Sequence, residues 1–221
     1  MAEQQIQDEL EAEPIEPEGP DDERAEDLDA ETLERRRHAL ANVRKFGDPV
    51  LRSPASPVED YGPELAAEVE RMIAIMHDAL GVGLAATQLG LMRRLLVFQA
   101  GPDATPTALV NPEVEWSSEE AETAEEGCLS LPGIVVDVER PLHVRVRARD
   151  AAGEPLEVEA SGLEARVIQH EIDHLDGVLM LDRAPTDQRR GALRALRDDT
   201  SYSPDPERGG EGPERASVNG D

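Results

Sequence analysis

The sequence predicts an α+β fold in which antiparallel strands pack around a buried central helix that carries a metal-binding motif. Three observations support this fold class. A helical pattern precedes a series of short β-patterned segments, an order of elements typical of α+β domains. A later helical pattern is apolar on nearly every side, as in a buried helix. That same helix contains the motif H-E-x-x-H, which is a signature of metal binding.

Charge divides the 221-residue chain, whose formal net charge is −27, into three parts. Residues 1–37 carry 4 basic and 15 acidic side chains, and residues 198–221 carry 2 and 7. Both ends are also poor in large apolar residues, a composition typical of disordered segments. We therefore predict a disordered acidic extension at 1–37, one folded catalytic domain at 38–197 and a disordered tail at 198–221.

Composition also limits where the protein acts and what it binds. The single cysteine, Cys128, excludes an intramolecular disulfide framework and is compatible with a reducing compartment. We find neither a signal peptide nor an apolar run long enough to span a membrane. The acidic ends argue against tight binding to nucleic acid. We therefore expect a cytoplasmic protein that neither enters a membrane nor recognises a nucleic-acid sequence.

Helices are predicted in the first part of the folded domain. Acidic residues followed by basic residues favour a short helix over Ala30–Val43. Gly62-Pro63 is typical of a helix start, and apolar residues then recur at helical spacing as far as Leu80. They predict an amphipathic helix of about 17 residues. The glycine-rich stretch Gly81–Gln88 follows, and it fits either a close-packed turn or a loop that lets a ligand approach the backbone.

Short strands are predicted after these helices. The stretch His143–Arg149 alternates apolar and arginine residues, which indicates a strand with one face toward a core. Asn111-Pro112 predicts a bend, and Asp150–Gly153 predicts a hairpin turn. The six predicted strands are Arg94–Phe98, Thr107–Val110, Val114–Trp116, Ile134–Val138, Leu142–Ala148 and Leu156–Ala160.

The buried helix is predicted over Gly162–Leu175. Within it, His170 and His174 are four residues apart and therefore lie on one face, where both can bind the same metal ion. Buried histidines need polar partners, and a metal ion supplies them. Glu171 between them is placed to act as a base on a metal-bound water.

Two histidines leave such a metal site one ligand short. Cys128 lies in a glycine-containing loop over Glu125–Pro132, and a thiolate with two imidazoles suits Zn²⁺ or Fe²⁺ with one position open for water. One metallopeptidase class places a third histidine where this chain has Met180, and another needs a glutamate that this region lacks. A purely structural metal site closes with four protein ligands and has no use for Glu171.

Taken together, three motifs resemble those of peptide deformylase. The family signatures G-x-G-x-A-A-x-Q, E-G-C-L-S and Q-H-E-x-D-H occur here, in the family's order, as Gly81–Gln88, Glu126–Ser130 and Gln169–His174. The resemblance extends over about residues 40–197. It implies removal of the formyl group from the N-terminal formylmethionine of newly synthesised proteins.

The resemblance also implies roles for individual residues. One divalent metal ion per chain is expected, Fe²⁺ as the working ion, with Zn²⁺ or Ni²⁺ able to occupy the site. Glu171 is expected to act as general base and then as general acid. Cys128, His170 and His174 are expected to bind the metal. The Gln88 amide and the Leu129 backbone N–H are expected to stabilise the oxyanion. The peptide is expected to bind along Gly81, Val82 and Gly83, and Leu163 and Val167 are expected to form the wall of the methionine pocket.

Two further predictions concern the surroundings of the site. Arg140 and Asp173 are expected to pair and so to support the cysteine loop against the helix. The segment Thr186–Arg197 is predicted to form a short helix with four arginines. The resemblance suggests that this helix docks on the ribosome, where N-formylmethionyl nascent peptides emerge, although a solvated helix end explains the same residues equally well.

Overall fold

The computed structural model describes residues 28–204, so most of the two extensions predicted to be disordered, 1–37 and 198–221, lies outside the described residues. Seven strands form two antiparallel sheets, so the predicted mixture of antiparallel sheets and helices is confirmed. The larger sheet has the strand order β1-β2-β3-β6-β7, and the smaller sheet pairs β4 with β5. Strand bounds are β1 Gly83–Ala85, β2 Leu95–Phe98, β3 Thr107–Ser117, β4 Ala121–Cys128, β5 Leu131–Pro141, β6 His143–Arg149 and β7 Pro155–Ser161.

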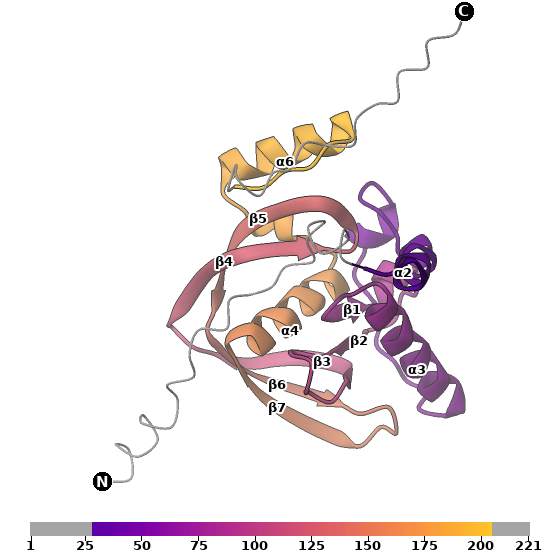
Figure 1. Ribbon diagram of the computed structural model, residues 1–221. Helices are drawn as coiled ribbons and strands as arrows, with labels where there is room; N and C mark the ends of the chain where they lie inside the picture. Colours follow the sequence, from indigo (N-terminus) through magenta and orange to yellow (C-terminus); the bar gives the residue numbers. More distant parts are fainter. Residues whose placement is uncertain (1–27, 205–221) are drawn as a thin grey trace, which may run out of the picture.

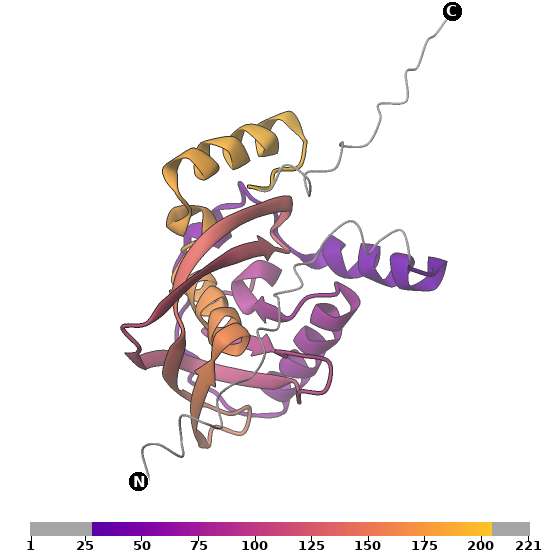
Figure 2. The ribbon, with the colours of Figure 1, turned by 60° about the vertical axis from the view of Figure 1, so that its left-hand side comes forward.

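The helix α4 lies between the two sheets (Figures 1 and 2). It spans Gly162–Leu175, the range that the sequence predicts. The remaining helices are α2 Ala30–Asn42, α3 Pro63–Asp78, α5 Met180–Arg183 and α6 Thr186–Asp198, with short 3₁₀ helices η2 Pro49–Arg52 and η3 Ala86–Leu89. None of the helices in residues 28–204 is long and apolar enough to cross a membrane.

The first described helix crosses the domain boundary that we predicted at residue 38. In α2, the Asp29 side chain accepts a hydrogen bond from the backbone N–H of Thr32, which satisfies a free donor at the helix start. Residues before 38 in this helix are mostly exposed, whereas Ala39 and Val43 are buried against α3 and its neighbours. The folded core therefore begins at the C-terminal end of α2.

The strands differ from the prediction in several details. The strand β3 is continuous through Asn111, where we predicted a bend between two strands. Asn111 adopts a φ of 53°, and its side chain bonds to the backbone of Val58, so the irregularity becomes a bulge within one strand. The strands β1 and β4 were not predicted, and the loop predicted over Glu125–Pro132 is instead the end of β4, a two-residue turn and the start of β5.

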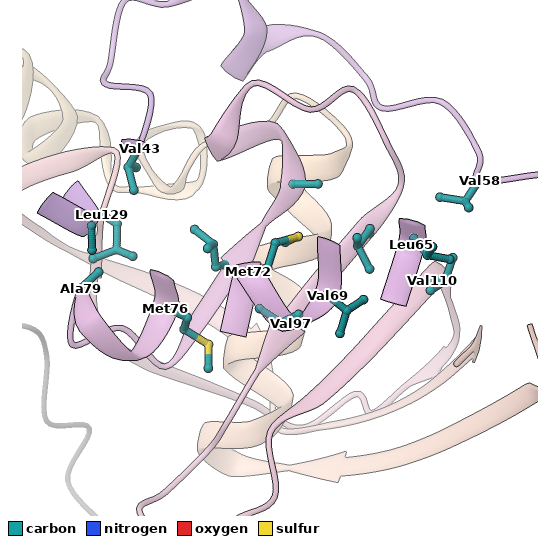
Figure 3. Packing of buried hydrophobic residues seen from close by; sticks show 14 residues of the cluster. Val43, Val58, Leu65, Val69, Met72, Met76, Ala79, Val97, Val110 and Leu129 are labelled. Atoms are coloured by element: carbon teal, nitrogen blue, oxygen red, sulfur yellow. The ribbon is translucent and has the colours of Figure 1, made fainter. Parts of the chain in front are cut away.

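Buried apolar residues form three clusters that meet near the ends of β1 and β4. The first packs α3 against β2 and β3 through Leu65, Val69, Met72 and Met76 (Figure 3). The second fills the space between α4 and the five-stranded sheet, and the third joins β5 to α5 and α6. The first cluster includes Leu129, the second includes Val167 and the third includes Cys128. All three cores therefore hold the predicted site in place.

Candidate metal centre

Three predicted ligands converge between β4 and α4. Cys128 is the last residue of β4, and His170 and His174 project from successive turns of α4. The ligand atoms of the three residues all lie within 4.8 Å of one another, and Cys128 Sγ is 3.2 Å from His174 Nε2. Cys128 and His174 are buried, and His170 is nearly so. The structure thus brings together the set of ligands that the sequence predicts.

This arrangement fits a divalent cation. Burial opposes ionisation of the Cys128 thiol, but the charge of His174 and a hydrogen bond from His170 outweigh it and hold the pKa of the thiol well below its usual range. The thiolate is the form that binds metal. Among residues 28–204, His174 Nδ1 and Glu171 Oε2 are buried polar atoms without a hydrogen-bond partner. Such atoms are uncommon in folded proteins, and two of the four among these residues belong to this site.

Glu171 lies beside these ligands on α4 and is buried. Burial raises the pKa of its carboxyl group, although the charges of His170 and His174 oppose the rise. A raised pKa suits a group that must first accept and then release a proton near neutral pH. Gly83 on β1 comes so close that a Cβ atom there would lie 2.5 Å from Glu171 Oε1. This close approach explains why the position needs glycine.

Gln88 and Leu129 both lie next to the cysteine. The Gln88 side chain is oriented by the backbone N–H of Ala85, which donates to Gln88 Oε1 at 2.9 Å. The Nε2 group of Gln88 then faces the site, 3.7 Å from Cys128 Sγ and 3.2 Å from Ser130 Oγ. Leu129 and Ser130 form the two-residue turn between β4 and β5. Both expected oxyanion donors are therefore next to the metal ligands.

One pocket contains nearly all of the predicted site. Its lining includes ten of the eleven predicted residues, and the exception is His174, which is buried beneath it. The predicted peptide-binding stretch Gly81–Gly83 forms one side, where β1 is the edge strand of the larger sheet. Residues that also line the pocket but were not predicted are Leu80, Glu125, Glu126, Gly127 and Arg166.

A buried network of charged side chains contacts the candidate metal ligands. Arg140 donates to Asp173 at 2.9 Å, so the predicted pair is formed, and it also donates to Glu126 at 2.5 and 2.8 Å. Glu126 in turn contacts His170 Nδ1 at 2.9 Å and accepts from Arg166 at 2.9 Å. Burial opposes its charge, but the hydrogen bonds and charges of Arg140 and His170 outweigh it and hold the pKa of Glu126 well below its usual range.

Our sequence reasoning gave no role to Glu126, although a signal was available. Residues 126 and 128 are two apart, and side chains two apart in a strand point to the same face. A strand ending at Cys128 therefore directs Glu126 toward the same helix. Its bond to His170 Nδ1 leaves the other ring nitrogen available to a metal, and such partners orient metal-binding histidines.

Comparisons with known proteins agree on one family. A family model described as "Polypeptide deformylase" matches residues 40–190. The peptide deformylase of Acidothermus cellulolyticus is 46% identical over 160 residues, which are 72% of this chain and 87% of that protein. The Thermotoga neapolitana enzyme is 47% identical over 159 residues, 72% and 96% of the two chains.

Solved structures extend the similarity to the fold. A peptide deformylase from Synechococcus elongatus in complex with actinonin has a TM-score of 0.67 and 40% identity, covering 72% of this chain and 88% of that one. The peptide deformylase of Thermotoga maritima has a TM-score of 0.63 and 47% identity, covering 65% and 96%.

Proposed function

This chain belongs to the polypeptide deformylase family, and we propose that the residues around its pocket remove the formyl group from N-terminal formylmethionine in the way set out below. The enzyme is a metallohydrolase of this family, and formylated nascent peptides are its substrates. The proposed mechanism rests on one observation. A cluster of one thiolate and two imidazoles shares a pocket with a buried glutamate, one of whose oxygens has no partner among the described residues.

In this proposal, α4 is the buried platform of the site, and Cys128, His170 and His174 hold one divalent cation. When bound, such a cation lowers the pKa of a coordinated water and makes hydroxide available near neutral pH. The ligand set suits both Fe²⁺ and Zn²⁺. We keep Fe²⁺ as the expected working ion, with Zn²⁺ or Ni²⁺ able to replace it.

Glu171 moves the proton. It accepts a proton from the attacking water as the water oxygen forms a bond to the formyl carbon. It then delivers that proton to the amine nitrogen as the carbon–nitrogen bond breaks, which releases formate and a free amino terminus. Its raised pKa and its burial next to the ligands support this role.

Gln88 and Leu129 stabilise the negative charge that develops on the formyl oxygen. The Gln88 Nε2 group and the Leu129 backbone N–H supply two hydrogen-bond donors, and loss of one such donor lowers kcat by about 100- to 1000-fold in other hydrolases. The Ala85 backbone N–H orients Gln88 before substrate arrives, so no energy is needed to turn it during the reaction.

The substrate binds as an added strand along Gly81-Val82-Gly83. Support comes from the edge position of β1, because an edge strand has main-chain groups available for pairing. Leu163 and Val167 line the same pocket from α4 and form the wall that contacts the methionine side chain.

Ribosome docking through Thr186–Arg197 stays a prediction, as does a cytoplasmic location. The helix α6 exposes Arg189, Arg190, Arg194 and Arg197. Two of these form ion pairs within the chain, Arg189 with Asp182 and Arg197 with Asp198. Internal pairing reduces the charge that those two arginines offer to RNA.

Glu171→Gln tests the mechanism directly. We expect anaerobically prepared protein to keep its metal but to hydrolyse formyl-Met-Ala-Ser about 100- to 10,000-fold more slowly, because a glutamine side chain cannot take the proton. Glu164→Gln is the matched control, since residue 164 lies two turns earlier on the same side of α4 and outside the pocket lining. Unchanged turnover in Glu171→Gln would refute the role, whereas metal loss would show a structural one.

A further inference from the structure

A three-residue segment after α2 connects the two proposed oxyanion donors. The backbone N–H of Arg44 donates to the carbonyl of Gln88 at 2.7 Å, and that of Phe46 donates to the carbonyl of Ser130 at 2.9 Å. Between them, the ammonium Nζ of Lys45 donates to the carbonyl of Leu129 at 2.8 Å. We call Arg44–Phe46 the bridging segment. It contacts both the turn that carries Gln88 and the turn that carries Leu129.

An apolar contact anchors the bridging segment next to these bonds. Val43, the residue just before it, is buried in the same cluster as Leu129 and Ala79, and the three lie near one another in Figure 3. The carbonyl bonds and the buried side chains therefore fix the same turn from two directions.

Lys45 is the side-chain contribution to this bridge. It is the only lysine in the chain, where the other 21 basic residues are arginines. Burial lowers the pKa of Lys45, while the nearby Cys128 charge opposes the change. Lys45 is exposed overall, but partly burying its ammonium group and ordering its long stem both cost free energy, so the bond to Leu129 must offset them.

We propose that Lys45 is a positioning residue for deformylation, which holds the Leu129 turn at a fixed separation from Gln88. The inference rests on the oxyanion roles proposed above for those two residues. Both donors must lie within about 2.7–3.1 Å of the same substrate oxygen, yet they belong to different parts of the chain, η3 and the β4–β5 turn. The bridging segment joins these parts, and Lys45 limits movement of Leu129.

The role predicts a particular kinetic pattern. A donor displaced by about 1 Å costs up to about 100-fold in rate without necessarily weakening substrate binding. Loss of the Lys45 contact should therefore lower kcat more than it changes KM. A residue that only stabilises the fold would change the melting temperature and leave the kcat of the folded enzyme unaltered.

The experiment compares Lys45→Met, Lys45→Arg and Arg71→Met as full-length, metal-loaded enzymes with formyl-Met-Ala-Ser as substrate. Lys45→Met keeps the apolar stem but removes the donor, Lys45→Arg restores a donor, and Arg71→Met removes an exposed cation from α3. We expect kcat to fall about 10- to 100-fold in Lys45→Met, with KM within about twofold and metal content unchanged. Lys45→Arg should recover most of the loss, and Arg71→Met should match wild type.

Two results would overturn the inference, namely wild-type kcat in Lys45→Met, or a loss of rate that follows loss of metal. If Lys45→Met does not fold, Lys45→Gln is used instead. The glutamine side chain is shorter than lysine and does not reach the Leu129 carbonyl, so the same fall in kcat is expected. Wild-type kcat in that variant would likewise reject the positioning role. Failure of the wild-type enzyme to release formate would instead reject the proposed function, so the two failures are distinguishable.

Discussion

Arg140→Met should have a large effect although Arg140 binds neither metal nor substrate. The Arg140 side chain is 3% exposed and donates to both Glu126 and Asp173. Methionine fills a similar volume but leaves these buried carboxylates without that partner. The loss is partial, because Arg166 still contacts Glu126 and Arg183 still contacts Asp173.

The magnitude follows from burial. Removing one partner of a buried ion pair costs about 3–5 kcal/mol, and the two remaining arginines favour the lower value, about 3 kcal/mol. In a domain of this size each kcal/mol lowers Tm by about 2–4 °C, so we expect a fall of about 6–12 °C. Because Glu126 also orients His170, metal affinity should fall by about 10- to 100-fold.

Thermal unfolding of the metal-free protein and metal titration at pH 7 measure these two effects. Arg147→Met is the matched control, because Arg147 also pairs with two carboxylates, Glu113 and Glu115, but is 63% exposed. Exposed pairs contribute about 0–1 kcal/mol, so its Tm should fall by less than about 4 °C. Equal Tm values for the two variants, or wild-type metal affinity in Arg140→Met, would refute the reasoning.

Two further predictions test the ligand set and the close packing of β1. Removing the metal with a chelator should allow iodoacetamide to alkylate Cys128, because the histidines hold the pKa of its thiol low against the effect of burial. Adding metal back should slow the alkylation. Equal alkylation rates with and without metal, measured by mass spectrometry, would argue against a ligand role. Gly83→Ala should lower kcat/KM by about 100-fold at unchanged metal content, because the added Cβ displaces Glu171. Gly62→Ala is the control: its added Cβ meets no atom within 4 Å, so kcat/KM should not change. Wild-type turnover in Gly83→Ala would contradict the predicted displacement.

Local pattern was sufficient for the four longer helices of residues 28–204 and insufficient for α5, β1 and β4. The range of α4 agrees with the prediction because helical spacing and burial on all sides are visible within the segment itself. The strand β4 has the sequence AETAEEGC, which is acidic and lacks the β-branched alternation of β6. It is a strand because it pairs with β5 from Ala121 to Cys128, a contact that its own residues do not indicate.

Within the site, the sequence alone determined the relation between His170, Glu171 and His174, because helix geometry makes their spacing a spatial statement. Only the tertiary structure decided how Cys128 reaches them, since that depends on the pairing of β4 with β5 and the packing of α4 between the sheets. The bond from Lys45 to Leu129 joins residues 84 positions apart. No local pattern encodes such a contact, because it arises from the folding of distant segments onto a shared core.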